Sequence, residues 1–338
     1  MTSSQTILVT GGAGFIGAHV AKRLAHEGHH IIIVDNFNPY YDPTLKEARI
    51  QTLLADVPHT LYRTDIADHA AMRDIFEKHA IDQVCHLAAQ AGVRYASEAP
   101  FVYEHSNLRG TLTLLELARE FQVSNIVIAS SSSVYGDASR YPVKETDMTD
   151  KPISLYAATK RACELMAHSY HHLYALPITC LRFFTVYGPW GRPDMAFFSF
   201  TKAAIEGTPI DVYGQGDMAR DFTYIDDIVE GIVRTLETPS AWEILNLGRG
   251  KAEPLMHMIE LVEQATGKMI EKTFTQMQPG DVRQTWADIS RAKTILNWEP
   301  HMNLDEGIPK FVEWYKGYYR DLNKSMNAHK GAVNSKGL

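Results

Sequence analysis

The sequence contains little of what marks several common protein classes. Its three cysteines, Cys85, Cys163 and Cys180, include no CxxC pair, which argues against a disulfide framework and against a zinc motif. No apolar run approaches the ~18 residues that cross a bilayer, and the first residues show no signal-peptide pattern. We therefore expect a cytoplasmic protein with no membrane segment.

Positive charge is also scarce. The chain has 33 Lys and Arg residues against 40 Asp and Glu residues, so its formal net charge is −7. A broad nucleic-acid-binding surface needs a cationic stripe, and this balance disfavours one. An anionic ligand would therefore have to be bound by a few well-placed arginines.

Two catalytic signatures are missing. The sequence has no GxSxG motif, the pattern around a serine hydrolase nucleophile. His168, His171 and His172 fall on one predicted helix, but neither an HExxH glutamate nor a third ligand accompanies them. We expect no metal site and interpret these histidines as a solvated or interface face.

The first half of the chain alternates between strand-like and helix-like segments. The β-rich runs are residues 6–10, 30–35, 60–65, 83–89, 125–131 and 178–183. This alternation predicts βαβ units and a parallel sheet with helices on both faces.

After residue 184 the regular alternation of strands and helices ends. Longer loops separate the short strands IDVYG, DFTYI and EILNLG, and helical patterns follow at 225–238, 254–266 and 304–322. We expect a first domain over 1–183, a smaller lobe over 184–322 and a polar, mobile tail over 323–338.

A glycine-rich turn follows the first predicted strand. Gly11, Gly14 and Gly17 lie between that strand and a helix, where glycines let the backbone approach a pyrophosphate. A Walker loop is excluded because Ala18 stands where that motif needs lysine. The second strand ends in Asp35, whose carboxylate can accept both ribose hydroxyls of NAD and would repel the phosphate of NADP. A capping or turn aspartate is the alternative.

Two further patterns carry chemistry. Asp65 ends the third run, where it either reaches an adenine amino group or caps the next helix. Tyr156 and Lys160 are four residues apart on a predicted helix, so both can point into one cleft. An ammonium beside a phenol favours the phenolate that a general base requires. A YxxxK pair alone is weak, but here it accompanies the glycine turn and four serines that end the fifth strand, Ser130 to Ser133.

From residue 5 to about 320 the chain resembles the extended short-chain dehydrogenase/reductase superfamily. The motifs that carry the resemblance are TGGAGFIG, HLAAQAGVR, SSSSVYG, YAATK, LRFFTVYGP and RDFTYIDDIVEG. The resemblance implies an α/β fold: a Rossmann-type, doubly wound parallel sheet that binds NAD tightly, with a smaller C-terminal α/β lobe that binds a nucleotide sugar.

The same resemblance implies residue roles. Tyr156 would be the general base, and Lys160 would orient it and the cofactor ribose. Ser131 would contact the reacting sugar hydroxyl, with Ser133 as a second contact. Besides Tyr156 and Lys160, the positions expected to bind the cofactor are Gly11, Gly14, Phe15, Ile16, Gly17, Asp35, Asn36, Asp65, Ile66, Leu87, Ala88, Asn107 and Phe183.

The resemblance also narrows the reaction. Nucleotide-sugar 4,6-dehydratases of the superfamily usually carry Asp-Glu before VYG, where this chain has Ser132 and Ser133. UDP-glucuronate decarboxylases usually carry a glutamate at the position of Ser133, so they are disfavoured less firmly. Epimerisation at C4 is what remains: hydride passes to NAD, the 4-ketone turns, and hydride returns to its other face.

Residues 35–50 and 183–200 resemble UDP-glucuronate 4-epimerases, which interconvert UDP-glucuronate and UDP-galacturonate. By this resemblance Arg192, with Thr185 assisting, binds the C6 carboxylate of a UDP-hexuronic acid. A solvated loop arginine is the alternative for Arg192. Arg220 and Arg283 match arginines that hold the diphosphate, and Arg94 assists with either carboxylate or phosphate.

Other readings stay open. A UDP-glucose or UDP-N-acetylhexosamine 4-epimerase and a decarboxylase are the enzymatic alternatives. An NAD(H)-responsive binding protein is the non-enzymatic alternative. Such a protein would be expected to have lost the catalytic serine, tyrosine or lysine, and this chain keeps all three. Helical patterns at 104–121 and 154–175 are apolar on more than one side, as in helices that pair between subunits of this superfamily. We expect a homodimer, with simple burial as the alternative, and by resemblance a role in polysaccharide biosynthesis.

Overall fold

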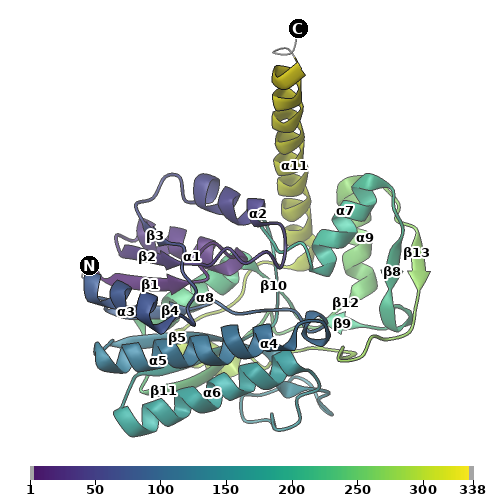
Figure 1. Ribbon diagram of the computed structural model, residues 1–338. Coiled ribbons are helices and arrows are strands. Elements are labelled where there is room, and N and C mark those ends of the chain that lie inside the picture. The colour runs from purple at the N-terminus through teal and green to yellow at the C-terminus, as the bar shows by residue number, and fades with distance from the viewer. Residues whose placement is uncertain (1–3, 335–338) are drawn as a thin grey trace.

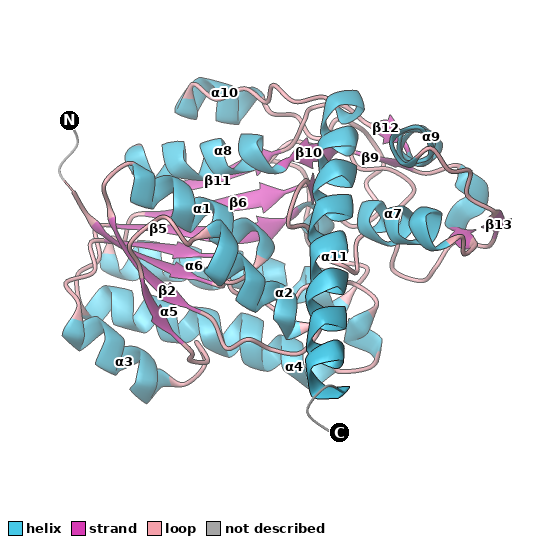
Figure 2. Cartoon of the chain, turned by 90° about the horizontal axis from the view of Figure 1, so that it is seen from above, coloured by secondary structure: helices cyan, strands magenta, loops and turns pink. Residues whose placement is uncertain are grey.

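A seven-stranded parallel sheet forms the centre of the molecule (Figures 1 and 2). The computed structural model describes residues 4–334, with the backbone alone at residue 321 and at residues 323–334. Every strand pair in this sheet is parallel. In spatial order the strands are β11 (Trp242–Leu247), β6 (Ile178–Phe183), β5 (Asn125–Ser131), β4 (Gln83–His86), β1 (Thr6–Thr10), β2 (His30–Val34) and β3 (Thr60–Tyr62).

The central positions of the strands are mostly apolar because both faces of the sheet are covered. Side chains alternate across a strand, so Ile7 and Val9 of β1 enter one hydrophobic core while Leu8 enters the other. In β2, Ile31 and Ile33 enter the first core, and Ile32 and Val34 the second. This is the pattern expected for a parallel sheet between two layers of helices.

Helices form these two layers, as the view from above shows (Figure 2). On the first core lie α1 (Phe15–His26) and α8 (Ile225–Glu237), and on the second lie α3 (His69–Lys78), α5 (Gly110–Glu120) and α6 (Leu155–Tyr174). Shorter segments connect the strands and helices of this part: α2 (Pro43–Ala48), η1 (Arg49–Leu53), η2 (Tyr95–Ser97), α4 (Pro100–Tyr103), η3 (Glu104–Arg109) and η4 (Ser132–Tyr135).

The remaining elements of the described residues are short strands and four helices, of which α10 packs on β11 and α8 and the others belong to the second lobe. Its strands pair as β10 with β7, β12 with β9 and β13 with β8. Figure 1 shows α7, α9 and β13 together, away from the large sheet. The elements are β7 (Thr185–Tyr187), α7 (Ala196–Glu206), β8 (Ile210–Val212), η5 (Tyr213–Gly216), β9 (Ala219–Arg220), β10 (Phe222–Tyr224), β12 (Glu253–Pro254), α9 (Leu255–Thr266), β13 (Lys272–Phe274), α10 (Ser290–Leu296) and α11 (Leu304–Asn334).

Two expectations need correction. The EILNLG strand, expected in the second lobe, is β11, which pairs with β6 and forms an edge of the large sheet. Buried Leu245 and Leu247 there complete the first core. The helix expected to end at 322 continues to Asn334, so most of the predicted tail is helical; residues 335–338 lie outside the described part of the chain. Within that part, no helix is both long and apolar enough to span a membrane.

The sheet topology locates a cleft. The chain builds β1, β2 and β3 in one direction and then crosses back to place β4 on the other side of β1. Loops after β1 and β4 therefore diverge at their carboxyl ends, which is where doubly wound sheets bind ligands.

Candidate active site

The pocket begins at the glycine turn after β1, where the backbone is too crowded for side chains. Gly11 has a φ of +69°, and a Cβ there would lie 2.8 Å from the backbone of Ala88. A Cβ on Gly17 would lie 2.2 Å from the carbonyl oxygen of Gly11. Helix α1 starts after Gly14 with no side-chain cap, so its first N–H groups face the turn. This arrangement fits a dinucleotide pyrophosphate.

Asp35 at the end of β2 is held by the glycine turn itself. Its carboxylate accepts hydrogen bonds from the backbone N–H of Ala13 at 3.2 Å and of Phe37 at 2.8 Å. Lys46 of α2 lies 3.4 Å away and is also buried. A carboxylate fixed in this way suits two ribose hydroxyls. Lys46 was not predicted, because nothing in the local sequence links α2 to the end of β2.

The cap of the next helix is Asp68, whose side chain accepts from the Ala71 N–H, so the capping alternative for Asp65 was wrong. Asp65 instead faces the same pocket. It accepts hydrogen bonds from the Ala67 N–H at 2.9 Å and from Asn36 Nδ2 at 3.2 Å, and His105 Nε2 lies at 3.2 Å. Burial raises the pKa of this carboxyl, but these hydrogen bonds together hold it below its ordinary value.

The catalytic candidates Ser131, Tyr156 and Lys160 line the other end of the pocket. Lys160 Nζ donates to the carbonyl oxygen of Ala129 at 2.8 Å, which ties helix α6 to the strand that ends in Ser131. Ser131 Oγ donates to Ser133 Oγ at 3.1 Å. Helix α6 starts where it does because Ser154 caps it, accepting from the Ala157 N–H at 3.1 Å.

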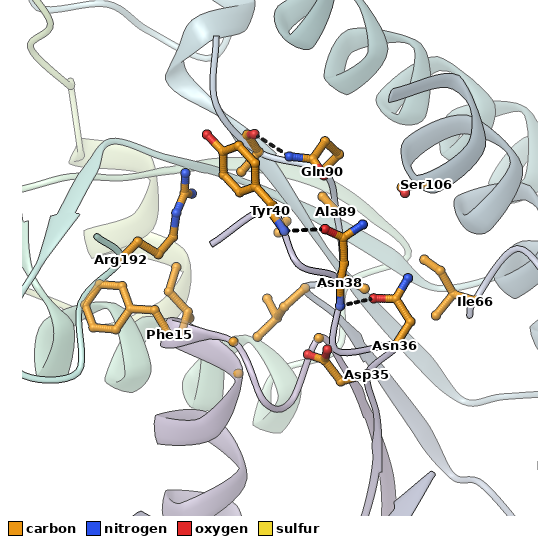
Figure 3. Close-up of a pocket in the computed structure, with 18 of the residues that line it drawn as sticks. Phe15, Asp35, Asn36, Asn38, Tyr40, Ile66, Ala89, Gln90, Ser106 and Arg192 are labelled. Carbon is orange, nitrogen blue, oxygen red and sulfur yellow. Dashed lines mark hydrogen bonds between the residues drawn. The ribbon is translucent and has the colours of Figure 1, made fainter. Parts of the chain in front are cut away.

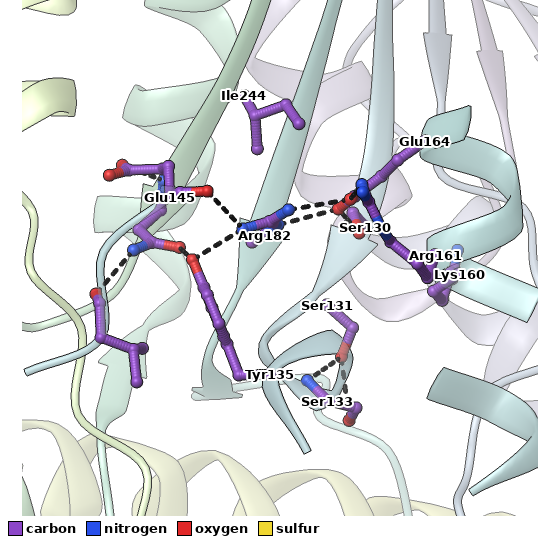
Figure 4. A network of polar contacts seen from close by, with 12 residues as sticks. Ser130, Ser131, Ser133, Tyr135, Glu145, Lys160, Arg161, Glu164, Arg182 and Ile244 are labelled. Atoms are coloured by element: carbon purple, nitrogen blue, oxygen red, sulfur yellow. Dashed lines mark hydrogen bonds and ion pairs between the residues drawn. The ribbon is translucent and has the colours of Figure 1, made fainter. Parts of the chain in front are cut away.

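A buried ion pair holds these elements in register (Figure 4). Glu164 of α6 accepts from Arg182 Nε and Nη2, both at 2.9 Å, and from Ser130 Oγ at 2.6 Å. Arg182 of β6 also donates to Tyr135 Oη at 3.0 Å. Both charged side chains are almost completely buried. Sequence reasoning missed this pair, which positions α6 against the serine-bearing strand.

Arg192 lies in the pocket and not in solvent. Its side chain is 24% exposed and lines the same cavity as Tyr156 and Lys160. The guanidinium points toward Tyr40, which comes from the loop after β2 (Figure 3). Arg192 Nε donates to Asp194 Oδ1 at 3.0 Å, and Nη2 donates to Asp194 Oδ2. The structure therefore rejects the solvated-loop alternative.

A second arginine, Arg49, anchors the backbone next to Arg192. Its guanidinium is fully buried and donates to the carbonyl oxygens of Trp190 at 2.7 Å and of Ala13 at 3.1 Å. It also donates to Tyr41 Oη at 2.7 Å. Arg49 therefore connects the glycine turn to the loop that carries Arg192, two segments far apart in the sequence.

Most of the predicted site residues meet in this pocket. Those that line it are Gly11, Gly14, Phe15, Ile16, Gly17, Asp35, Asn36, Asp65, Ile66, Leu87, Ala88, Ser131, Tyr156, Lys160, Phe183 and Arg192. Their ligand contacts remain predictions. Lining residues that the sequence reasoning did not single out include Asn38, Tyr40, Tyr41, Lys46, Gln90, Ser106 and Met195.

Two predicted residues lie just behind the pocket lining. Asn107 is buried, and its side chain accepts from the Gln90 N–H at 2.8 Å and donates to Thr159 Oγ1 at 3.0 Å. It therefore supports the wall of the pocket. Ser133 touches the site through its hydrogen bond with Ser131.

The remaining predicted arginines and Thr185 belong to the second lobe or its border. Thr185 begins β7, and its N–H donates to the Asp221 carbonyl oxygen at 3.0 Å. Arg220 Nη1 donates to the carbonyl oxygen of Arg283 at 3.1 Å, so these two residues are neighbours. Arg94 pairs with Asp281 at 2.9 Å. None of the four lies among the residues that line the described pocket.

The comparisons with known proteins identify the family. The model of the NAD dependent epimerase/dehydratase family matches residues 7–248, more than half of the chain. This chain belongs to that family. Membership confirms the resemblance inferred from the glycine turn and the YAATK and SSSSVYG motifs, together with the expected α/β fold, and it confirms NAD as the cofactor.

Within the family, one relative is the UDP-glucuronate 4-epimerase of Thermodesulfobacterium geofontis, 47% identical over 91% of this chain and 95% of that protein. A similar solved structure is UDP-glucuronic acid 4-epimerase from Bacillus cereus in complex with UDP-glucuronic acid and NAD. It has a TM-score of 0.87 and 37% identity over 93% of this chain and 100% of that chain. The UDP-glucose 4-epimerase of Thermotoga maritima, another family member, has a TM-score of 0.85 and 32% identity over 93% of this chain and 99% of that chain.

The described residues also show the surroundings of the histidines on α6. In that part of the chain, no three His, Cys, Asp or Glu side chains gather as metal ligands would. His168 and His171 instead pack against the ring of Trp242, at 5.0 and 5.9 Å between ring centroids.

Proposed function

We propose that this protein is a UDP-glucuronate 4-epimerase that interconverts UDP-glucuronate and UDP-galacturonate through a 4-keto intermediate. The observation that carries the proposal is the position of Arg192, which lines one pocket with Ser131, Tyr156 and Lys160. An arginine that faces the catalytic group gives a reason to prefer a sugar acid over a neutral sugar. The names of the similar proteins support the same substrate.

In this proposal Tyr156 takes the proton of the C4 hydroxyl and returns it after the ketone has turned. The bound NAD supplies reversible hydride acceptance at C4. Lys160 keeps positive charge next to the tyrosine, and its bond to the Ala129 carbonyl keeps it in place. The Ser131 hydroxyl donates to the C4 oxygen, where negative charge develops.

Arg192 would serve a second purpose once C4 is a ketone. The intermediate is then a β-keto acid, which loses CO2 when the C5–C6 bond stands perpendicular to the carbonyl plane. The electrons of that bond would pass into an enolate. Two parallel hydrogen bonds from Arg192 can hold the carboxylate away from that alignment and keep its charge.

The second lobe would bind the UDP part. Arg220 and Arg283 are adjacent in the structure, which supports their proposed role at the diphosphate. The large sheet would carry the cofactor. The proposed boundary between the two domains near residue 183 therefore has one exception, because β11 returns to the large sheet. A cytoplasmic location and a role in polysaccharide biosynthesis are part of the proposal.

The deciding experiment follows UDP-glucuronate with the purified protein, without added NAD, by NMR of the anomeric protons. We expect UDP-galacturonate to grow to a stable mixture. UDP-pentose with CO2 would instead indicate a decarboxylase, which the serine at position 133 disfavours. Turnover of UDP-glucose alone would remove the proposed role of Arg192.

We also propose a homodimer formed through α5 and α6. Leu112 of α5 is 43% exposed and Leu165 of α6 is 53% exposed, and the two helices lie side by side (Figure 1). Exposed leucines on adjacent helices are typical of an interface. Light scattering should give twice the monomer mass for the natural chain and the monomer mass for Leu165→Glu.

A further inference from the structure

The guanidinium of Arg192 has two edges that can bind a carboxylate with paired hydrogen bonds. One edge consists of Nε and Nη2, and the other of Nη1 and Nη2. Asp194 occupies the first edge, because its Oδ1 accepts from Nε at 3.0 Å and its Oδ2 accepts from Nη2. The second edge is therefore the one that Arg192 can offer to a ligand carboxylate.

Asp194 is itself held from the cofactor side of the pocket. Tyr40 Oη donates to Asp194 Oδ2 at 3.2 Å. Burial, reinforced by the charge of Asp194, raises the pKa of Tyr40 to about 12, so the phenol keeps its proton and remains a donor. Burial raises the pKa of Asp194, but Arg192 more than offsets this and holds it below its ordinary value. The carboxylate therefore stays ionised at neutral pH.

The ring of Tyr40 has little freedom to move. It packs against the ring of Tyr95 at 4.9 Å between centroids. Its hydroxyl also lies over Gly92, where a Cβ would come within 2.4 Å of the oxygen. A side chain confined in this way is a rigid support for its acceptor.

We infer that Asp194, supported by Tyr40, is a positioning residue that fixes which edge of Arg192 meets the C6 carboxylate of the substrate. This inference rests on the proposed function. Asp194 would touch no reacting atom and would act through Arg192 alone. The paired charges also cancel, so selectivity for the sugar acid would come from the orientation of the guanidinium more than from excess positive charge.

Removal of the Asp194 charge then has a specific consequence. In Asp194→Asn, Arg192 keeps its full charge and loses its orientation, so the substrate carboxylate is still attracted but is no longer held in one plane. Binding should persist while the 4-keto intermediate samples geometries that release CO2. A residue that only maintained the fold would weaken all ligands alike.

The experiment uses the holoenzyme and UDP-glucuronate labelled with 13C at C6. For Asp194→Asn we expect kcat for epimerisation to fall about tenfold, the cost typical of a misplaced reactant, with KM unchanged or lower. The fraction of label that appears as bicarbonate should rise at least about fivefold by the same loss of orientation. Inhibition by UDP-glucose, which has no carboxylate, should not change.

Three further variants make the test specific. Tyr40→Phe should shift kcat and the bicarbonate fraction in the same direction by a smaller factor, and it serves if Asp194→Asn does not fold. In an Arg192→Met background, Asp194→Asn should not raise the bicarbonate fraction further, because both residues act on the same orientation of the carboxylate. Glu243→Gln is the matched control, because Glu243 forms a bidentate pair with Arg291 at 2.8 Å outside the pocket.

The outcomes separate the two proposals. If the natural enzyme does not epimerise UDP-glucuronate, the proposed function fails. If it does, but Asp194→Asn and Tyr40→Phe leave kcat and the bicarbonate fraction unchanged, the positioning role fails. The role also fails if Asp194→Asn raises KM for UDP-glucuronate and weakens inhibition by UDP-glucose equally, because a general structural defect predicts that result.

Discussion

At the residue scale, Arg49 is unusual because a fully buried cation is surrounded by neutral acceptors. Its guanidinium donates to carbonyl oxygens of Trp190, Gly191 and Ala13 and to the hydroxyl of Tyr41. A buried charge is tolerated only when such hydrogen bonds replace its lost hydration. The carbonyl oxygens among these acceptors would in turn lose this buried donor if the guanidinium were removed.

We expect Arg49→Met to lower the free energy of unfolding by about 3 kcal/mol or more, because several buried carbonyl oxygens lose their donor. Urea unfolding measures the change. Arg63→Met is the control, since Arg63 pairs with Glu47 on the surface at 2.7 Å and such pairs contribute less than about 1 kcal/mol. Equal effects of the two substitutions would contradict the stabilising role of the buried hydrogen bonds of Arg49.

The residues that complete the site could not be read from the sequence. Tyr40 and Asp194 are hydrogen-bonded although they are separated by 154 positions. Lys46 looks like any surface lysine of a short helix until the fold places it 3.4 Å from Asp35. The motifs brought out Gly17, Tyr156 and Lys160, which do line the pocket, because their spacing is a local pattern. The support for Arg192 depends on tertiary contacts that have no local pattern.

At the element scale, the approach of α1 to the glycine turn determines the shape of the cofactor pocket. The Gly17 Cα lies so close to the Gly11 carbonyl oxygen that an added Cβ would be 2.2 Å from it. The atoms that this Cβ would meet belong to the backbone of Gly11 and Gly12, so turning a side chain cannot relieve the crowding.

We therefore expect Gly17→Ala to push α1 away from the turn, lower stability by about 1–3 kcal/mol and reduce the NAD that co-purifies with the protein. Nucleotide released on denaturation and thermal unfolding measure the two effects. Gly317→Ala provides the contrast: a Cβ there meets no atom within 4 Å, and alanine in a helix stabilises by up to about 1 kcal/mol. A Gly17→Ala protein with full NAD content would refute the steric argument.

Strands with continuous apolar sequence were predictable, and their partners were not. The runs at 125–131 and 178–183 coincide with β5 and β6, because burial on both faces leaves a clear local signal. The strand β11 has a weaker signal, because its first half is only partly buried, and its membership in the large sheet depends on pairing with β6. The extension of α11 beyond residue 322 lacks apolar periodicity, so the pattern predicted its end too early.

At the scale of the whole molecule, acid stability depends on a histidine between the sheet and α5. His86 is 3% exposed, with Nδ1 2.8 Å from Thr10 Oγ1 and Nε2 3.0 Å from Thr111 Oγ1. Burial, aided by the charge of Lys160, lowers its pKa to about 3. In the unfolded chain it titrates near ~6.5.

Between these values the unfolded chain binds a proton that the folded protein does not. The free energy of unfolding should therefore fall as the pH drops below about 6.5, by up to about 1.4 kcal/mol per pH unit from this group. Urea unfolding at pH 7 and pH 5 tests this. His86→Gln should reduce the dependence and leave the part contributed by His19, whose pKa burial lowers to about 4. Acidic groups whose pKa is lowered in the folded protein, such as Glu164, reduce the free energy of unfolding only at lower pH. An identical slope in the variant would show that His86 does not contribute.

The late position of β11 in the sequence has a consequence for synthesis on the ribosome. When residues 1–183 have emerged, β6 still has an open hydrogen-bonding edge, and α8 is absent from the face of the sheet that it shares with α1. Open strand edges and uncovered apolar faces invite association with other nascent chains. The large sheet is completed only after residue 247, by which point Arg192 and Asp194 have already been translated. The loop that carries Arg192 and Asp194 is therefore synthesised before the sheet beside it has gained its last strand, and a chaperone that shields the β6 edge would protect the chain during that interval.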